Sequence, residues 1–332
     1  MNPLRIAFLF GGMGEERGVS LDSASHLLAC VPEDVIPVPI GITKEGEWHL
    51  SRPEELDSKR GKGNVTLSCG ALRANGEDLG IDAVFPVMHG NYGEDGTVQG
   101  LLAALRIPFV GCDTAASALC MNKARAKALS FRVPSLPHLL FSPEDLPHAP
   151  AEILGTLGLP VFIKPNGSGS SLGASPVTAE SELLPALHRA AAVGEVLCEP
   201  LVSAREIEVG LLQTEAGLLV SRPGEILKPT EFYDYSAKYE GETALSAPAE
   251  LSSDVSATLR GYARHLFCVL GCRDLARVDF FLTEKGEILF NEINTMPGFT
   301  AGSMYPRLWE KEGYPLSDLI GLLCRQAARR RL

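Results

Sequence analysis

Short, continuous apolar runs alternate with helical patterns in the first third of the chain. The runs at residues 5–10, 35–40 and 83–88 are typical of buried strands. Residues 21–30 and 96–105 have the composition and spacing of helices instead. Strands that alternate with helices form crossover connections, so this order predicts an α/β domain built around a mostly parallel sheet.

The pattern changes after residue 120. Stretches rich in proline at 132–138 and 141–150 interrupt it before an apolar strand that ends at Lys164. A predicted helix at 182–192 leads to a strand-rich portion at 206–294. We therefore expect three domains, at residues 1–120, 121–205 and 206–332.

The end of the chain combines an amphipathic pattern with basic residues. Apolar side chains recur at i, i+3, i+4 and i+7 and predict a helix: Leu316, Leu319, Ile320 and Leu323. The only concentration of arginine lies at 325–331, in a chain whose net charge is -11. Binding to phosphate backbones requires clustered cations, so this composition argues against nucleic acid as a partner.

Composition also bears on location. The chain has 332 residues and is 45% hydrophobic, yet no apolar run reaches the length that spans a membrane. The apolar start ends at Gly11 and Gly12, which makes it too short for a signal sequence. We expect a cytoplasmic protein that binds no membrane. The eight cysteines form no CxxC pair and no zinc spacing, so we expect them to be buried as small apolar residues.

The most informative chemistry lies near the end of the strand-rich portion. Asp279, Glu292 and Asn294 alternate with apolar residues in two neighbouring predicted strands, and Arg277 shares the face of Asp279. Magnesium prefers hard oxygen ligands, usually one or two carboxylates completed by water and phosphate. The pattern therefore predicts a magnesium-nucleotide site.

An ordinary half-buried hairpin, with its turn at residues 284–287, would show a similar alternation. It does not explain why Asp279 and Glu292 stand among so many large apolar side chains, since unpaired buried carboxylates are costly.

A glycine- and serine-rich loop, 164–173, follows the strand that ends at Lys164. Its backbone N–H groups and hydroxyls can surround phosphate oxygens, although a plain flexible tip has the same composition. It is no Walker loop, because its lysine precedes the glycines. Lys123, which opens a predicted helix, and Lys164 can place two positive charges on one polyphosphate.

The first strand-to-helix turn offers a competing nucleotide site. Gly12 and Gly14 begin a dinucleotide fingerprint, with Glu33 and Asp34 about twenty residues further on. Arg17 replaces its third glycine, where close helix packing allows no side chain. The acids of this turn suit the ammonium group of a small zwitterion better, and the helix N-terminus suits its carboxylate.

Taken together, these residues resemble the ATP-grasp superfamily and, within it, the D-alanine–D-alanine ligase family, over essentially the full length. The motifs that carry the resemblance are 9–20, 89–100, 121–123, 164–173, 205–209, 231–239, 277–279 and 291–298. The resemblance implies an ATP-grasp fold of three domains. It also implies ATP-dependent ligation of two D-alanines through an acyl phosphate, for synthesis of peptidoglycan precursors.

The resemblance further implies how ATP is held, between the central and C-terminal domains. Its phosphates would meet Lys123, Lys164, Ser170, Ser171 and Lys238. Glu206 would bind the ribose, and the adenine edge would comprise Glu199, Pro200, Leu201 and Val202. Pro200 lacks an N–H but keeps a carbonyl that accepts from the adenine amino group. Two magnesium or manganese ions would bridge the β and γ phosphates on Asp279, Glu292 and Asn294.

Two amino-acid subsites are implied as well. The ammonium of the first D-alanine would meet Glu16, with His89 nearby, and its carboxylate would take the γ-phosphoryl group. The carboxylate of the second would bind Ser303 and the backbone of Met304. Arg277 and the Gly298 N–H would form the oxyanion hole.

Residues 231–239 are similar to the family's mobile lid, in which Tyr239 would pair with Ser170 and Glu16. Tyr239 and Met304 favour D-alanine as the second substrate. Ligation of D-serine or D-lactate in that position is the alternative, and a nucleotide-binding regulator without catalysis is a more distant one. The resemblance also implies a homodimer.

Overall fold

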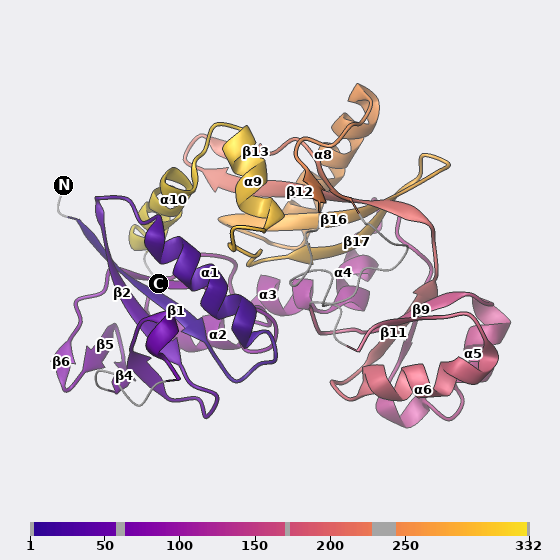
Figure 1. Ribbon diagram of the computed structural model, residues 1–332, viewed down its shortest axis with the longest axis horizontal. Helices are drawn as coiled ribbons and strands as arrows, with labels where there is room; N and C mark the ends of the chain where they lie inside the picture. The colour runs from indigo at the N-terminus through magenta and orange to yellow at the C-terminus, as the bar shows by residue number, and fades with distance from the viewer. Residues whose placement is uncertain (1–2, 58–63, 170–172, 228–243, 331–332) are drawn as a thin grey trace.

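The computed structural model describes residues 3–57, 64–169, 173–227 and 244–330. Three main sheets lie side by side, as Figure 1 shows from indigo at the N-terminus to yellow at the C-terminus. A mixed arrangement of helices and sheets was the predicted fold class, and it is confirmed.

The N-terminal sheet has the strand order β3-β2-β1-β7. β1 pairs in parallel with both β2 and β7, and only β3 is antiparallel, so the predicted mostly parallel sheet is confirmed. Its elements are β1 (Leu4–Gly11), α1 (Arg17–Ala29), β2 (Val35–Ile42), β3 (Trp48–Leu50), η1 (Pro53–Glu55), β7 (Ala83–Pro86) and α2 (Thr97–Ala104). A small antiparallel sheet beside it comprises β4 (Val65–Ser68), β5 (Ala71–Ala74) and β6 (Glu77–Asp78).

Two short helices, α3 (Thr114–Met121) and α4 (Lys123–Leu129), lead from this unit to the central sheet. That sheet is antiparallel in the order β10-β9-β11-β8. Its elements are β8 (Leu139–Phe141), η2 (Pro143–Asp145), α5 (Ala149–Thr156), β9 (Val161–Pro165), β10 (Ser175–Val177), α6 (Glu180–Ala191) and β11 (Val196–Pro200). Helices α5 and α6 share a buried apolar cluster with β9 and β11.

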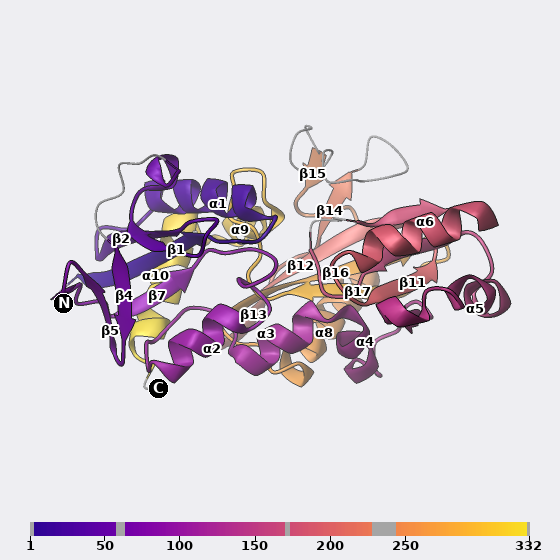
Figure 2. The ribbon, with the colours of Figure 1, turned by 90° about the horizontal axis from the view of Figure 1, so that it is seen from below.

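The C-terminal sheet has the order β15-β14-β12-β16-β17, with β13 paired to β12. Its strands are β12 (Ala204–Thr214), β13 (Gly217–Val220), β14 (Gly224–Leu227), β15 (Ala244–Ser246), β16 (Leu275–Thr283) and β17 (Ile288–Asn294). The described residues of this part also form the helices α8 (Ser253–Val269), α9 (Met304–Lys311) and α10 (Leu316–Ala328). Figure 2 shows α3 and α4 running beside this sheet.

The two faces of the C-terminal sheet differ in chemistry because side chains alternate along a strand. On one face Ile207, Val209 and Val278 pack with α8 in a single apolar cluster. The opposite face therefore carries the alternate residues, which include Glu208 and Asp279. The site is built on this polar face.

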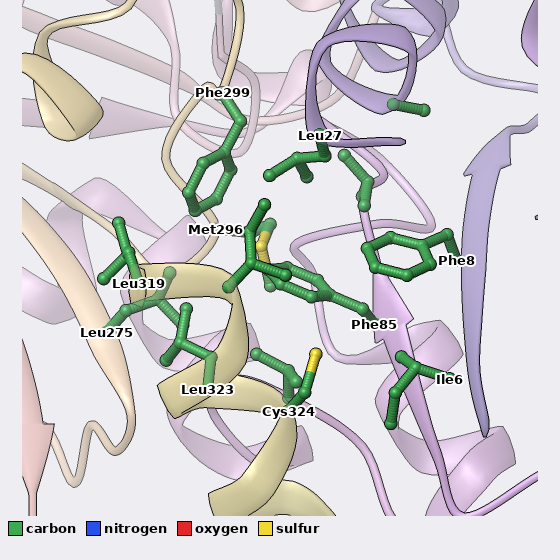
Figure 3. Close-up of a cluster of buried hydrophobic side chains, with 14 of the residues drawn as sticks. Ile6, Phe8, Leu27, Phe85, Leu275, Met296, Phe299, Leu319, Leu323 and Cys324 are labelled. Carbon is green, nitrogen blue, oxygen red and sulfur yellow. The ribbon is translucent and has the colours of Figure 1, made fainter. Parts of the chain in front are cut away.

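The last helix completes the core of the first sheet. Leu319 and Leu323 of α10 belong to the same buried cluster as Phe8 and Phe85 of the N-terminal strands, and Figure 3 shows them facing one another. Full burial of one such side chain stabilises the fold by about 1.5–3 kcal/mol. The predicted amphipathic helix is thus present, but it covers residues at the opposite end of the sequence.

The prediction that all the cysteines are buried was wrong in part. Cys69 and Cys268 are exposed, whereas Cys112, Cys120, Cys198, Cys272 and Cys324 are buried as expected.

No helix in the described parts of the chain is both long and apolar enough to cross a membrane.

Candidate functional site

The polar face of the β16–β17 hairpin meets α4 and the loop after β9 at a small cavity of about 20 Å³. The residues that line it come from all three parts of the chain. They are Glu94, Cys120, Met121, Lys123, Ser168, Gly169, Glu292, Ile293, Asn294 and Thr295.

The hairpin sets four of the predicted residues opposite one another. Arg277 faces Asn294 and Asp279 faces Glu292 in the strand register. The Arg277 guanidinium donates from Nε to Asp279 Oδ1 at 2.8 Å and from Nη2 to Oδ2 at 2.7 Å. Asn294 Nδ2 donates to Asp279 Oδ2 at 3.0 Å. The sequence had predicted this grouping, and its turn at 284–287 does join β16 to β17.

Arg277 is also 3.1 Å from Glu208, which pairs with Asp279 across β12 and β16. Burial alone lowers the pKa of Arg277, but the charges of Asp279 and Glu208 outweigh it and raise that pKa above its ordinary value. The guanidinium is therefore a fixed charge that can face developing negative charge on a substrate.

Lysines from two other elements face the acids of this cluster. Lys123 begins α4, as predicted, because the side chain of Asn122 caps that helix by accepting from the Arg125 N–H. Lys123 Nζ lies 3.1 Å from Glu292 Oε2 and donates to the Ser168 carbonyl at 2.6 Å. The cation thus lies between the hairpin acids and the glycine-rich loop.

Lys164, at the end of β9, lies 2.7 Å from Glu199 and donates to Asn291 Oδ1 at 3.0 Å. Lys127 approaches the other oxygen of Glu199 at 2.7 Å. Burial raises the pKa of Glu199, but the charges of Lys164 and Lys127 lower it to about 2. The Glu199 carboxylate is therefore ionised and shared between two cations.

The donor set of the hairpin fits a divalent cation with hard-oxygen preference. Asp279, Glu292 and Asn294 supply two carboxylates and an amide oxygen within one register, and phosphate and water complete such a shell. Within the described ranges, no group of three His, Cys, Asp or Glu side chains is placed to hold a metal by itself.

Glu16 lies at the start of α1 with 6% of its surface exposed. A methyl group added at Gly169 would lie 2.9 Å from its Oε2, and one added at Gly90 would overlap the same oxygen. Two glycine backbones, from the loop after β9 and the loop after β7, therefore approach the Glu16 carboxylate closely.

His89 and Glu94 belong to that second loop and are buried. Burial lowers the pKa of His89 to about 4, and its Nε2 lies 3.1 Å from Ser23 Oγ. Burial, followed by the charge of Glu16, raises the pKa of Glu94 to about 8. Near neutral pH the site therefore holds an uncharged imidazole and a glutamate that carries a proton.

The predicted second subsite lies at the start of α9. Ser303 precedes the helix, and its Oγ accepts from the Thr300 N–H at 3.0 Å. A methyl group at Gly298 would lie 2.7 Å from that Oγ. Met304 is buried against Ile226. The structure thus brings the two predicted residues of this subsite together with Gly298 of the predicted oxyanion hole, where a helix N-terminus favours a carboxylate.

The predicted adenine edge, Glu199 to Val202, lies at the end of β11, where the chain passes from the central sheet to β12 of the C-terminal sheet. The Leu201 N–H donates to the Pro160 carbonyl at 3.0 Å. Glu206, the predicted ribose ligand, is half-buried on β12. Ser170, Ser171, Lys238 and Tyr239 lie outside the described residues.

Sequence reasoning assigned no role to Glu94, Glu208 or Lys127. Local patterns could have found two of them: Glu208 alternates with Glu206 along a strand, and Lys127 lies one helical turn after Lys123. The contacts of the first strand-to-helix turn do not favour the alternative dinucleotide site there. Asp34, its fingerprint acid, lies 2.7 Å from Arg325 at the surface, and Arg17 lies 2.6 Å from Asp57.

Two antiparallel-rich sheets that enclose lysines, a buried arginine and magnesium-type ligands define an ATP-grasp ligase. Residues 5–112 match the family model described as D-ala D-ala ligase N-terminus, and residues 129–325 match D-ala D-ala ligase C-terminus. The chain belongs to the D-alanine–D-alanine ligase family, whose members are ATP-dependent ligases that use a divalent metal.

Individual relatives agree with the family match. The D-alanine–D-alanine ligase of Caldicellulosiruptor bescii is 39% identical, over 97% of this chain and 94% of its own length. That of Sodalis glossinidius is 41% identical, over 98% and 96%. Among solved structures, the VanG D-Ala:D-Ser ligase from Enterococcus faecalis is 35% identical with a TM-score of 0.86, over 97% and 98%. The D-alanine–D-alanine ligase from Coxiella burnetii is 30% identical with a TM-score of 0.85, over 98% and 95%.

Proposed function

We propose that this protein joins two D-alanines to D-alanyl-D-alanine with ATP, through an acyl phosphate, for peptidoglycan precursor synthesis. The observation that carries the proposal is the position of Arg277. Its guanidinium bonds Asp279 and lies 3.1 Å from Glu208 on the polar face of the sheet, and its charge acts on His89 and Glu94 of the loop that approaches Glu16. One group can thus serve both a phosphorylated carboxylate and the amine that attacks it.

In the first step the D-alanine ammonium pairs with Glu16, and its carboxylate turns toward the γ-phosphate. Lys123 and Lys164 neutralise the polyphosphate, since phosphoryl transfer depends mainly on positioning and charge. Asp279, Glu292 and Asn294 would hold two magnesium or manganese ions. When bound, such ions supply positive charge to the transferring phosphoryl group. The neutral His89 adds no charge that competes with Glu16 for the ammonium.

In the second step Ser303 and the N-terminus of α9 fix the carboxylate of the second D-alanine. Its unprotonated amine forms the C–N bond at the acyl carbon, the C–O bond to phosphate breaks, and phosphate leaves with that electron pair and takes up the proton that the nitrogen loses. Arg277 and the Gly298 N–H stabilise the carbonyl oxygen while it is negative, which is worth about 2.7–4 kcal/mol for a single donor in comparable sites.

The test is turnover of the purified protein with ATP, magnesium and D-alanine. We expect phosphate and D-alanyl-D-alanine in equal amounts, and none of either after chelation with EDTA. Glu292→Gln should raise the magnesium concentration required for half-maximal rate. ATP turnover without dipeptide, or ATP binding without turnover, would contradict the proposal and favour a regulator.

Ligation of D-serine is the second candidate, because one similar structure is titled a D-Ala:D-Ser ligase. The buried, apolar surroundings of Met304 favour an acceptor with a methyl side chain. A competition assay with equal D-alanine, D-serine and D-lactate as acceptors decides between them. We expect the D-alanine product to dominate.

Three further properties belong to this proposal. The domains divide at 120/121 and 205/206; separate apolar clusters around the N-terminal and central sheets support two distinct units, although α10 of the third domain packs into the core of the first. The protein acts in the cytoplasm as a homodimer. Sedimentation equilibrium of the purified chain tests the dimer, and fractionation of cells tests the location.

A further inference from the structure

A buried lysine outside the predicted site forms a charge cluster with one predicted phosphate ligand. Lys127 has none of its side chain exposed, and its Nζ lies 2.7 Å from Glu199 Oε1. The other carboxylate oxygen, Oε2, lies 2.7 Å from Lys164 Nζ. Two cations therefore share one anion, in a place that water hardly reaches.

Lys127 also joins two sheets. Its Nζ donates to the Phe290 carbonyl of β17 at 3.0 Å and lies 5.8 Å from the centre of the Phe290 ring. Glu199 belongs to β11 of the central sheet. Lys127 thus contacts both sheets between which the ATP-grasp site lies.

The charges of this cluster decide what Lys164 can offer a phosphate. With Lys127 present, the negative charge of Glu199 is already neutralised, so the charge of Lys164 is in excess. Without Lys127, Glu199 would neutralise Lys164 itself. In a buried site the loss of one unit of charge is poorly screened by solvent.

We propose that Lys127 is a positioning residue that neutralises Glu199 and so leaves the charge of Lys164 for the phosphates of ATP. This inference rests on the proposed function. Loss of the Lys127 charge should weaken the binding of ligands that carry phosphates and should leave the binding of a nucleoside unchanged. A residue that only supports packing would weaken nucleoside and nucleotide alike.

The sequence offers matched variants. Lys127→Met removes the charge and keeps the length of the side chain, whereas Lys127→Arg keeps the charge. Arg125→Met is the control, because Arg125 lies on the same helix with an exposed side chain and its loss changes the net charge equally. Equilibrium binding of magnesium-ADP and of adenosine is measured for each, together with the KM for ATP.

We expect Lys127→Met to weaken magnesium-ADP binding and to raise the KM for ATP by about tenfold or more. The binding free energy that corresponds to tenfold is a modest fraction of one buried charge interaction. Adenosine binding should stay within about twofold, and Arg125→Met and Lys127→Arg should resemble the unmodified protein. Equal losses for ADP and adenosine, or no loss of ADP binding, would overturn the proposal. Because the unmodified protein supplies the reference turnover, failure of the proposed function would be seen separately.

A second measurement applies if Lys127→Met does not fold. Burial and the nearby charge of Lys164 lower the pKa of Lys127 to about 8, although Glu199 of β11 and Glu292 of β17 oppose this. In the unmodified protein, magnesium-ADP affinity should therefore fall between pH 7 and pH 9, as Lys127 loses its proton. Lys127→Arg should remove this part of the fall, while identical profiles would contradict the charge role.

Discussion

The Arg277 guanidinium holds the Asp279 carboxylate through two parallel hydrogen bonds, of 2.8 Å from Nε and 2.7 Å from Nη2. Both side chains come from the polar face of β16, with one residue between them. This fork fixes the plane of the guanidinium and hence the direction of its remaining N–H groups. A lysine can keep the charge here but cannot keep that direction.

Arg277→Lys should therefore separate charge from geometry. We expect kcat to fall by about 100-fold, because the oxyanion donor is misplaced. Binding of magnesium-ADP should change by less than about threefold, since Lys123 and Lys164 remain. Steady-state kinetics and calorimetric binding measure the two effects. Arg273→Lys, at the start of the same hairpin region but bonded to the Gly111 carbonyl, should leave kcat unchanged. An unaltered kcat in Arg277→Lys would refute the oxyanion role.

Because of Glu94, the free energy of unfolding should fall as pH rises from about 4.5 to about 8. Its pKa is raised from 4.5 to about 8, by burial first and by the charge of Glu16 second. Between these two values the folded state keeps a proton that the unfolded state has released. Stability from this group is therefore present below the unfolded pKa and is lost as pH rises toward 8, with a slope of at most about 1.4 kcal/mol per pH unit.

Glu94→Gln cannot lose that proton, and its amide oxygen can still accept from the Gly90 N–H that bonds Glu94 at 2.8 Å. Urea unfolding at pH 5.5 and 7.5 measures this. The free energy of unfolding of the variant, relative to that of the unmodified protein, should rise by about 2 kcal/mol from the lower to the higher pH. Glu77→Gln, at an exposed position of β6, should show no such gain. Parallel pH dependence of the variant and the unmodified protein would rule out a protonated Glu94.

Local patterns predicted the hairpin chemistry because the residues involved are close in sequence. Arg277 and Asp279 share a strand face, and the 284–287 turn brings Glu292 opposite Asp279. Lys123 was placed at a helix start for the same local reason. These relations need only the period of a strand or helix and one short turn.

Contacts between distant segments could not be predicted in this way. The pairing of Lys123 with Glu292 requires α4 to lie against β17, and the approach of Gly169 to Glu16 requires the central unit to reach the N-terminal one. The docking of α10 on Phe8 and Phe85 depends on tertiary packing of the same kind. Periodicity shows that a face is apolar, but it does not say which partner covers that face.

Gly169→Ala tests the first amino-acid subsite. The added methyl group would lie 2.9 Å from Glu16 Oε2 and 3.1 Å from Oε1, so the carboxylate must move away. We expect the KM of the first D-alanine to rise by about tenfold, which corresponds to roughly 1.4 kcal/mol of lost ammonium binding. Gly167→Ala, in the same loop but with nothing within 4 Å, is the control and should bind normally. An effect of equal size in both variants would point to the loop and not to Glu16.

Gly298→Ala tests the second subsite by the same logic. Its methyl group would lie 2.7 Å from Ser303 Oγ, which is also held by Thr300 through contacts of 3.0 Å and 2.9 Å. The hydroxyl must therefore leave the position in which it would bind the acceptor carboxylate. We expect the KM of the second D-alanine to rise by about tenfold, that of the first to stay within about twofold, and kcat to fall. Gly302→Ala, whose methyl group meets only Thr300 Oγ1 at 3.8 Å, should behave normally. A rise confined to the first D-alanine would mean that the two subsites are assigned in the wrong order.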